Sequence, residues 1–480
     1  MSLPDLETLG QRAMAAPRVD RIREALAGTP AWLVGGAVRD IALERTVNDL
    51  DLAVAGPPEG PARKIAGVLD GVAFELSEDF PAWRVKDRDD AWQVDLAELR
   101  APEIEQDLAL RDFTVGAIAV GLEDGQALDP MGGLGDLESG LIRSCGPASF
   151  TDDPLRIMRA ARLSAQFGWE IEESTAALAR QAAPRSEEPA GERTLAELIL
   201  LIGSPDPLAG LAAMDRIGLF DWLLPEIGDL HGVVQGPNHH LDVYGHTMEV
   251  VEGILRIESD LERFTGEHAP QVSEYLSRPL ADGASRGVAL RLGALFHDSA
   301  KPQTRSEEGG FVSFRGHDSL GAEQIGARFR DLRASRKLVG YMSDLTRHHL
   351  ILGFMVPSMP LQKRHIFSYL DHTDPVALDV TLLTVADRLA ARGTASIASQ
   401  EMVAGHLELA RDMVGFALDW DRNGPPPQFL PGNELAAELG IEPGPELGRV
   451  MNELAAARFA GEISDANEAV EHARGFLEAE

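Results

Sequence analysis

The hydrophobic pattern of this 480-residue chain changes near residue 150, and this change restricts the fold more than any other feature. Before it, short apolar runs alternate with turn signals in residues 31–145, which predicts a mostly antiparallel or mixed sheet with helices. Residues 1–30 and nearly everything after residue 153 follow a helical pattern, as in "PLRIMRAARLSAQFG". The sequence therefore predicts an α+β N-terminal domain followed by an all-α remainder.

Composition and charge narrow the class of protein. A chain of this length exceeds one hydrophobic core, so we expect about two to four domains. The formal net charge of −33 argues against general affinity for nucleic acid but leaves room for a local basic groove. Cys145 is the only cysteine, which excludes an internal disulfide bond. No apolar run approaches the roughly 20 residues of a membrane span, and the N-terminus lacks a signal peptide, so we expect a cytoplasmic protein with no membrane partner.

Residues 32–54, "WLVGGAVRDIALERTVNDLDLAV", combine a glycine turn, an arginine and two acids. The strand expected at "LDLAV" places Asp49 and Asp51 on one face. Such neighbouring carboxylates repel each other unless a cation lies between them, and Mg²⁺ suits both carboxylates and phosphates. Gly35 and Gly36 allow close approach to phosphate, and Arg39 can hold a triphosphate. An isolated Asp-x-Asp pair is common on surfaces, but this combination favours nucleotidyl transfer with Asp49 and Asp51 as catalytic, magnesium-binding residues.

This stretch resembles the active-site motif of class II tRNA nucleotidyltransferases, which build the CCA 3′ end of tRNA, and of the related bacterial poly(A) polymerases. The resemblance continues in "RDFTVGAIAV", "DPMGGLGDLESGLIR", "FTDDPLRIMRAARLSAQFGW" and "GERTLAEL". It implies a nucleotidyltransferase palm at residues 1–145 and a helical neck that recognises RNA and nucleotide at 146–238. An HD domain at 239–395 and a helical tRNA-binding tail at 396–480 would follow.

The resemblance also implies further contacts to the incoming nucleotide. Arg111 and Asp112 match a family motif whose residues contact ribose and phosphates. Leu110 and Gly116 stand where the family has Arg and Asn, which leaves the sugar and primer contacts open to change. Asp95 in "WQVDLAEL" lies on a predicted strand, either as a third carboxylate near the metal or as a solvated strand residue.

Asp153 and Arg156 match the family pair that reads the base edge in place of a nucleic-acid template. They lie three residues apart, so one helix face presents both, and Arg159 one turn later would support the same nucleotide site. Asp153 before Pro154 is also a good helix N-cap, and the two roles are compatible. Asp152 replaces the family's Glu, a conservative departure.

A second site is expected among the histidines between residues 239 and 387. The vicinal pair His297-Asp298, placed by its pattern inside an apolar helix, is costly to bury without a metal or partner. With His246 and Asp387, this pair resembles the ligand series of HD-domain phosphohydrolases. Two further ligands, His317 and His349 rather than His348, would extend the set to two metals. Lys301 could approach a substrate phosphate.

Imidazole and carboxylate ligands suit Mn, Fe, Ni, Zn or Mg ions at this second site. HD domains attached to the family suggest phosphatase or 2′,3′-cyclic phosphodiesterase activity on damaged RNA ends. An inactive, structural HD domain is the alternative.

The connection before the Arg-Asp-Phe-Thr motif is short. Only ten residues, 101–110, separate Arg100 from Arg111, which allows a tight connection or a helical turn. In the family, shortening of this loop accompanies enzymes that stop after two cytidines, because the loop helps the base-reading pair shift from cytosine to adenine. The resemblance thus predicts a CC-adding enzyme that uses CTP and tRNA and needs a separate A-adding enzyme.

Three other functions stay open at this point. The first is a complete CCA-adding enzyme that uses CTP and ATP. The second is a poly(A) polymerase, whose bacterial members typically carry a basic C-terminal extension and no HD domain. The third is an HD phosphohydrolase with an RNA-binding N-terminal half. Residues 431–480 carry eleven acids and three arginines, so the predicted tail would hold tRNA by shape and a few contacts rather than by bulk charge.

Overall fold

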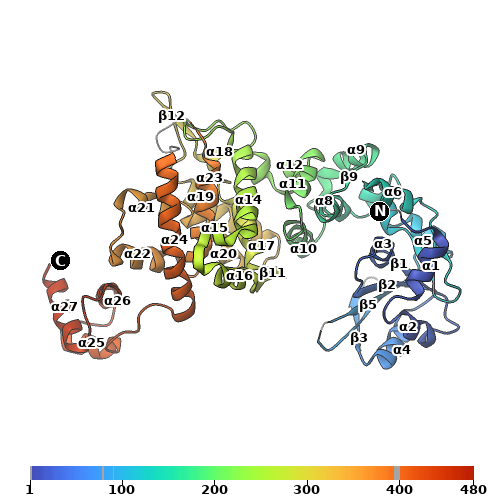
Figure 1. The fold of residues 1–480 in the computed structure, drawn as a ribbon, viewed down its shortest axis with the longest axis horizontal. Helices are drawn as coiled ribbons and strands as arrows, with labels where there is room; N and C mark the ends of the chain where they lie inside the picture. The colour runs from blue at the N-terminus through green and yellow to red at the C-terminus, as the bar shows by residue number, and fades with distance from the viewer. Residues whose placement is uncertain (1–2, 78–80, 90, 394–399, 480) are drawn as a thin grey trace. The chain divides into compact units, whose positions relative to one another are not determined.

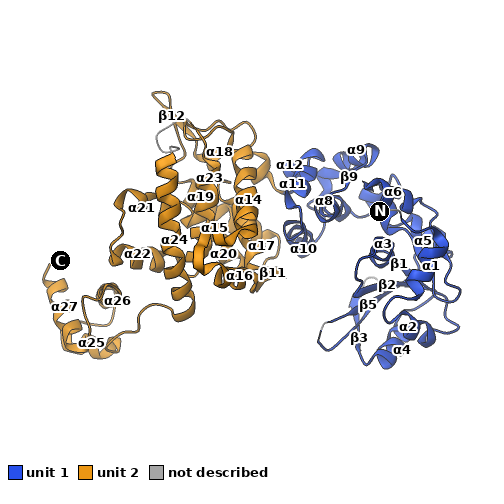
Figure 2. Ribbon diagram, viewed as in Figure 1, with its two compact units in different colours: residues 1–223 blue, residues 224–480 orange. Residues whose placement is uncertain are grey.

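The computed structural model describes residues 3–77, 81–89, 91–393 and 400–479. Within them the chain divides into two compact units, residues 1–223 and 224–480 (Figures 1 and 2). Unit 1 contains a seven-stranded sheet followed by helices, and unit 2 is helical apart from two short hairpins. The predicted succession of an α+β part and an all-α part is confirmed, and the finer division into four domains stays a prediction.

The sheet of unit 1 has the strand order β3-β4-β5-β2-β1-β6-β7. Strands β2 and β5 run parallel and the other neighbours run antiparallel, so the sheet is mixed. Its strands are β1 (Ala31–Val34), β2 (Asp49–Val54), β3 (Val72–Ser77), β4 (Ala82–Lys86), β5 (Gln93–Glu98), β6 (Ala119–Gly121) and β7 (Ala127–Leu128).

One face of this sheet is covered and apolar. Leu50 of β2 and Val94 of β5 are paired in register and both are buried. Helix α4 (Glu59–Leu69) packs against β3 and β4 through its own buried side. Because side chains alternate along a strand, the opposite face of β2 carries Asp49 and Asp51. The remaining helices of this part are α1 (Leu6–Met14), α2 (Val19–Ala25), α3 (Gly36–Ala42), α5 (Ile104–Ala109) and α6 (Gly133–Ser139).

A helical segment completes unit 1. Helix α8 (Leu155–Phe167) packs against both α10 (Gly191–Ile202) and α11 (Pro207–Arg216). The other helices here are α7 (Ser149–Asp152), α9 (Glu173–Ala182) and α12 (Phe220–Leu223), and a two-stranded parallel pair joins β8 (Leu141–Ile142) to β9 (Glu170–Ile171). The base-reading residues expected from the sequence therefore lie at the start of α8, inside the same unit as the sheet.

Unit 2 is organised around α14 (Val243–Ser259), which packs against both α17 (Arg286–Phe296) and α23 (Ala377–Ala390). The buried carboxylate of Asp379 on α23 accepts hydrogen bonds from the hydroxyls of Tyr275 (2.6 Å) and Tyr341 (2.9 Å) and from Arg286 (2.8 Å). This network joins four helices of the unit, since Tyr275 lies on α16 (Ala269–Ser277), Tyr341 on α20 (Arg336–His348) and Arg286 on α17.

The other elements of unit 2 before residue 424 are mostly helices. They are α13 (Pro225–Gly228), α15 (Leu261–Thr265), α16 (Ala269–Ser277), α18 (Lys301–Thr304), α19 (His317–Asp331), α20 (Arg336–His348), α21 (Ile351–Met355), α22 (Lys363–Thr373) and α24 (Gln400–Asn423), with hairpins β10 (Pro279–Ala281)–β11 (Ala284–Ser285) and β12 (Ser306–Glu308)–β13 (Phe311–Ser313). None of the described helices is long and apolar enough to cross a membrane.

Three helices follow the proline-rich residues 424–431. They are α25 (Gly432–Leu439), α26 (Pro445–Ala460) and α27 (Ala466–Ala479). They share a small core that includes Leu435, Val450 and Ala473. Arg364 of α22 donates to Glu453 at 2.8 Å and to Glu462 at 2.6 Å. Two acids of the predicted tail therefore form ion pairs with the rest of unit 2.

Candidate active sites

Strand β2 brings its two acids to the uncovered face of the sheet. Asp51 lies opposite Asp95 of the parallel strand β5, and Asp49 lies opposite Gln93. Asp95 in turn accepts two hydrogen bonds of 2.7 Å from Arg84 of β4. Burial, and then the neighbouring Asp95 carboxylate, raise the pKa of Asp51 to about 6. Burial and the neighbouring carboxylate thus make ionisation of Asp51 unfavourable. A bound divalent cation would favour the ionised form, so the position fits a cation site.

The glycine turn lies directly beside these carboxylates. Gly35 has φ +71°, and a Cβ on it would lie 3.0 Å from Oδ2 of Asp51 and 3.5 Å from a guanidinium nitrogen of Arg111. Only glycine fits both the backbone angle and the space. Arg39, one helical turn into α3, donates to Asp40 at 2.9 and 3.1 Å, so this arginine is already paired next to the turn.

The ten-residue connection forms one short helix, α5, as its length allows. Asp107 on this helix is 2% exposed and accepts from Arg100 (3.2 Å) and Arg111 (3.2 and 3.1 Å). Although burial opposes its ionisation, the backbone N–H of Arg100 and the two guanidinium groups lower the pKa of Asp107. Asp107 therefore fixes both ends of the connection, a role that no sequence motif indicated.

Asp112 and Arg159 form a second pair in the site. Their side chains meet at 2.9 Å, and the backbone N–H of Phe113 also donates to Asp112. Burial opposes ionisation of Asp112, but Arg159 holds its pKa below the usual value. Arg159 is thus oriented by a carboxylate from a different segment of the chain.

The expected base-reading pair lies at the junction of α7 and α8. Arg156 donates to the hydroxyl of Ser149 at 3.1 Å and to the carbonyl of Leu110 at 3.1 Å. Asp153 accepts from the backbone N–H of Leu155 at 3.2 Å and pairs with Arg193 at 3.0 Å. Helix α7 ends at Asp152 and Pro154 is the N-cap of α8, so Asp153 lies between the two helices. The expectations that one helix face presents Asp153 with Arg156 and that Asp153 is the N-cap are therefore wrong. Arg193 lies in the "GERTLAEL" stretch, whose role the sequence did not reveal.

These side chains line one cavity of about 570 Å³. Of the nucleotide-site residues predicted from the sequence, the cavity brings together Gly35, Gly36, Arg39, Asp51, Arg111, Asp112, Asp153, Arg156 and Arg159. Asp49 lies outside the described lining, on the same face of β2. Further lining residues that sequence reasoning missed include Arg100, Asp107, Arg162 and Gln166. The cavity is lined by both arginines and carboxylates, a combination that suits a nucleoside triphosphate with a metal ion.

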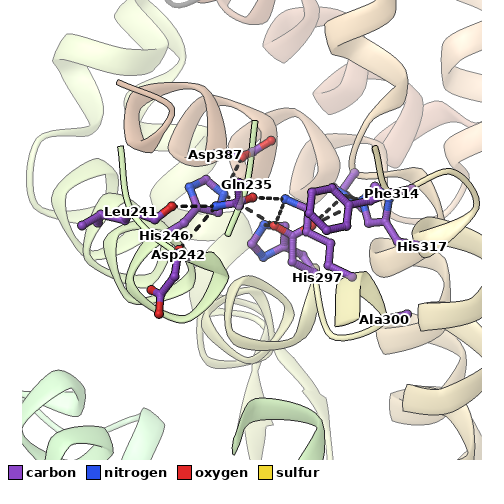
Figure 3. Close-up of polar contacts among 12 residues, drawn as sticks. Gln235, Leu241, Asp242, His246, His297, Ala300, Phe314, His317 and Asp387 are labelled. Atoms are coloured by element: carbon purple, nitrogen blue, oxygen red, sulfur yellow. Dashed lines mark hydrogen bonds and ion pairs between the residues drawn. The ribbon is translucent and has the colours of Figure 1, made fainter. Parts of the chain in front are cut away.

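The second site lies in unit 2, and all six ligands predicted for it come together. Figure 3 shows His246, His297, His317 and Asp387 of this set. They form two adjacent groups. His246, His297 and Asp387 make one group, and Asp298, His317 and His349 make the other. The helix α17 ends at Phe296, so the expectation that His297 and Asp298 lie inside a helix is wrong. Both residues follow the helix end, where the turn lets the two side chains point to the cluster.

Backbone carbonyls orient three of these imidazoles. The Nδ1 atoms of His297, His317 and His349 lie 2.8, 2.7 and 2.6 Å from the carbonyl oxygens of Ala294, Phe314 and Thr346. A carbonyl only accepts, so each Nδ1 carries a hydrogen, and in a neutral imidazole the Nε2 then presents a lone pair. The Nε2 atoms of His317 and His349 face each other at 3.3 Å. Two lone pairs in this position call for a cation between them, and this arrangement fits a metal site.

Asp298 connects the two groups. Its Oδ2 lies 3.0 Å from Nε2 of His297, and its Oδ1 lies 3.3 Å from Nε2 of His317. Burial opposes its ionisation, yet His297 and Lys301 hold the pKa of Asp298 well below the usual value. Lys301 contacts Asp298 at 2.6 Å and donates to Gln235 at 2.8 Å. No sequence pattern indicated the contact between Lys301 and Gln235.

Three models of known families match successive parts of the chain. The poly A polymerase head domain matches residues 31–103 and 78–143. The probable RNA- and SrmB-binding site of polymerase A matches residues 168–230, and the HD domain matches residues 243–392.

Solved structures of CCA-adding enzymes share the fold. A CCA-adding enzyme in complex with ATP covers 99% of this chain and 100% of its own, with a TM-score of 0.65 and 20% identity. The Thermotoga maritima CCA-adding enzyme complexed with tRNA covers 99% of this chain and 100% of its own, with a TM-score of 0.61 and 21% identity.

Curated relatives match along nearly the whole chain. An A-adding tRNA nucleotidyltransferase of Deinococcus radiodurans is 36% identical over 92% of this chain and 94% of its own length. A CC-adding tRNA nucleotidyltransferase of Thermus thermophilus is 32% identical over 93% of each chain. Together with the head-domain cavity and the HD ligand cluster, these matches show that the chain belongs to the tRNA nucleotidyltransferase family of enzymes.

Proposed function

We propose that this enzyme transfers CMP from CTP to the 3′ end of tRNA, with Mg²⁺ at Asp49 and Asp51. The observation that carries the proposal is the single cavity in which Asp51 and the Gly35 turn face the pair Asp153 and Arg156. The names of the relatives support tRNA as the acceptor.

The residues of the chain divide the chemical work. Mg²⁺ bound by the β2 carboxylates would supply Lewis-acid stabilisation of the charge that develops during transfer. Arg111 and the glycine turn would bind the phosphates. Arg156 donates and Asp153 accepts, which matches the acceptors and the amino group on the polar edge of cytosine. The base is thus selected by protein groups and no nucleic-acid template is needed.

We further infer that the enzyme stops after two cytidines. Residues 101–110 leave room only for α5, and Asp107 holds both ends of that connection through Arg100 and Arg111. Arg156 donates to the carbonyl oxygens of Leu110 (3.1 Å) and Arg111 (3.4 Å), so the base-reading arginine is attached to the short connection. Shifting its donors from cytosine to adenine requires moving an anchored segment. A separate A-adding enzyme would complete the tRNA.

Product length tests this proposal. The enzyme is incubated with CTP and ATP and with two tRNA transcripts, one ending before CCA and one ending in CC. We expect addition of two CMP residues to the first transcript and no extension of the second. Efficient AMP addition to the second transcript contradicts CC-only activity. If the first transcript then receives no CMP, the protein is an A-adding enzyme. If the first transcript is extended to a full CCA end, the protein is a CCA-adding enzyme. Long AMP tails indicate a poly(A) polymerase, and no incorporation at all contradicts the whole proposal.

A second proposal concerns the HD cluster, which we assign a metal-dependent phosphohydrolase activity on phosphate esters such as 2′,3′-cyclic RNA ends. The facing Nε2 atoms of His317 and His349 and the shared carboxylate of Asp298 support a transition metal, or Mg²⁺, at this site. Lys301 is placed to contact the phosphate, since its ammonium group lies against the cluster.

The test for the HD proposal combines metal content with hydrolysis. The purified protein is analysed for Mn, Fe, Ni and Zn and is assayed on a 2′,3′-cyclic nucleotide with added Mn²⁺, Ni²⁺ or Mg²⁺. We expect bound metal and hydrolysis that His297→Ala removes without loss of nucleotide addition. His365→Ala, on the exposed side of α22, serves as the matched control. Absence of both metal and hydrolysis in the wild-type protein makes the cluster structural.

A further inference from the structure

The edge strand β3 carries exposed apolar side chains next to the nucleotide cavity. Val72, Phe74 and Leu76 are 50%, 37% and 42% exposed. Exposed apolar side chains that gather on one strand usually mark a binding surface rather than chance. Leu76 also lines the cavity that contains Asp51, so this apolar group is continuous with the nucleotide site.

The strand register places Phe74 on the catalytic face of the sheet. Phe74 pairs with Arg84 of β4, Arg84 pairs with Asp95 of β5, and Asp95 pairs with Asp51 of β2. Residues that pair across neighbouring strands point to the same face. Trp83, the next residue along β4, points to the opposite face, because Arg63 of α4 lies over its ring. Phe74 and the catalytic carboxylate Asp51 therefore share one uncovered surface.

The chemistry of transfer requires a binding site on this side. In an in-line displacement the attacking hydroxyl and the leaving pyrophosphate lie on opposite sides of the phosphorus atom. The glycine turn follows β1, on one side of β2, and Arg111 also lies beside it. Strands β5, β4 and β3 lie on the other side of β2. The attacking 3′-hydroxyl therefore approaches over these three strands.

We propose that the catalytic face of β3 and β4 binds the single-stranded 3′ end of the acceptor RNA, with a base stacked on Phe74. Three interstrand spacings separate β3 from β2, or roughly 14 Å, a distance that a few nucleotides span. Arg84 and Lys86 on β4 are basic side chains beside this surface, and Arg84 is shared with Asp95, to which it donates two hydrogen bonds of 2.7 Å. The inference rests on the proposed function, because only a nucleic-acid acceptor needs this surface.

Charge and shape favour RNA over a protein partner as the occupant. In a chain with a net charge of −33, the pairing of an exposed aromatic ring with basic side chains on the next strand is suited to bases and phosphates. Leu76 of the same strand lines the cavity, and the RNA 3′ end must enter that cavity.

Steady-state kinetics of Phe74 variants test the inference. The Michaelis constants for a tRNA transcript lacking CCA and for CTP are measured separately in Phe74→Ala, Phe74→Trp and wild-type protein. We expect Phe74→Ala to raise the constant for tRNA about tenfold, the size of one lost stacking contact, and to leave the constant for CTP within about twofold. Phe74→Trp should restore tRNA binding because an indole also stacks. Phe354→Ala, at an exposed aromatic residue of α21, is the matched control and should behave as wild type.

The unchanged constant for CTP also reports that the Phe74→Ala protein is folded. If the constant for tRNA stays within twofold of wild type in Phe74→Ala, the surface does not bind the acceptor. The inference is also overturned if Phe74→Trp is as defective as Phe74→Ala, or if the constants for tRNA and CTP rise together. Failure of the proposed function looks different, because the wild-type protein itself would then add no nucleotide.

Discussion

At Asp51 the chain holds a carboxylate beside a second carboxylate, a glycine turn and Arg111. We predict that Asp51→Asn lowers the rate of CMP incorporation by at least about a thousandfold, since the metal contributes several kcal/mol to the transition state, and leaves tRNA affinity nearly unchanged. Incorporation of labelled CMP and a filter-binding assay measure the two effects. Asp70→Asn, at an exposed aspartate, is the control. Near-normal incorporation in Asp51→Asn and in Asp49→Asn would contradict the assignment of both residues.

Cys145 offers a second prediction for a single residue. Burial, and then the charge of Asp112, raise the pKa of this thiol to about 12. The thiolate is the reactive form, so at pH 8 its population is about a thousandfold smaller than in a thiol with the ordinary value of 9.0. We expect iodoacetamide to alkylate the native protein very slowly at pH 8 and faster as the pH rises. Mass spectrometry follows the single adduct, and the urea-unfolded protein should react at the rate of a free thiol. Equal rates would show that the thiol is not protected.

Among the elements, α5 depends on one buried carboxylate. We predict that Asp107→Ala destabilises unit 1 by about 3 kcal/mol, because it leaves Arg100 and Arg111 without their shared partner. Urea unfolding followed by tryptophan fluorescence measures the change in the free energy of unfolding. Glu105→Ala, an exposed position on the same helix, should change the stability by less than about 0.5 kcal/mol. A similar loss in both variants would assign the effect to the helix rather than to the ion pairs.

The elements also show which features a sequence can reveal. The alternation in "LDLAV" was enough to place Asp49 and Asp51 on one face, because a strand has a fixed two-residue period. The ten-residue spacing before Arg111 was enough to predict a short connection, which forms α5. The contacts of Arg193 with Asp153 and of Gln235 with Lys301 join segments far apart in the chain, and no local pattern encodes such partners. Asp107 and Arg111, in contrast, have the i,i+4 spacing of a helical ion pair, a local signal that was missed. The end of α17 at Phe296 was missed although the apolar run stops there and the polar stretch "HDSAKP" follows.

At the scale of the whole molecule, the two candidate sites belong to different compact units. A ligand stabilises the unit that binds it, by about 2.7 kcal/mol at a concentration 100 times its dissociation constant. We predict two calorimetric transitions. In a buffer that keeps Mg²⁺ in excess, removal of bound transition metal by a chelator should lower only the transition of unit 2. His297→Ala should abolish this response and Asp51→Asn should retain it. A single transition that moves as one with the chelator would show that the units unfold together.

The position of β3 at the edge of the sheet has a consequence for how the protein behaves at high concentration. An edge strand with apolar side chains can pair with the same strand of another molecule and so nucleate aggregation. The net charge of −33 opposes such encounters by mutual repulsion, which acts over about 8 Å at physiological salt. The acidity of the chain thus opposes self-association at β3, whose apolar side chains cannot be replaced by polar ones without weakening the proposed RNA binding.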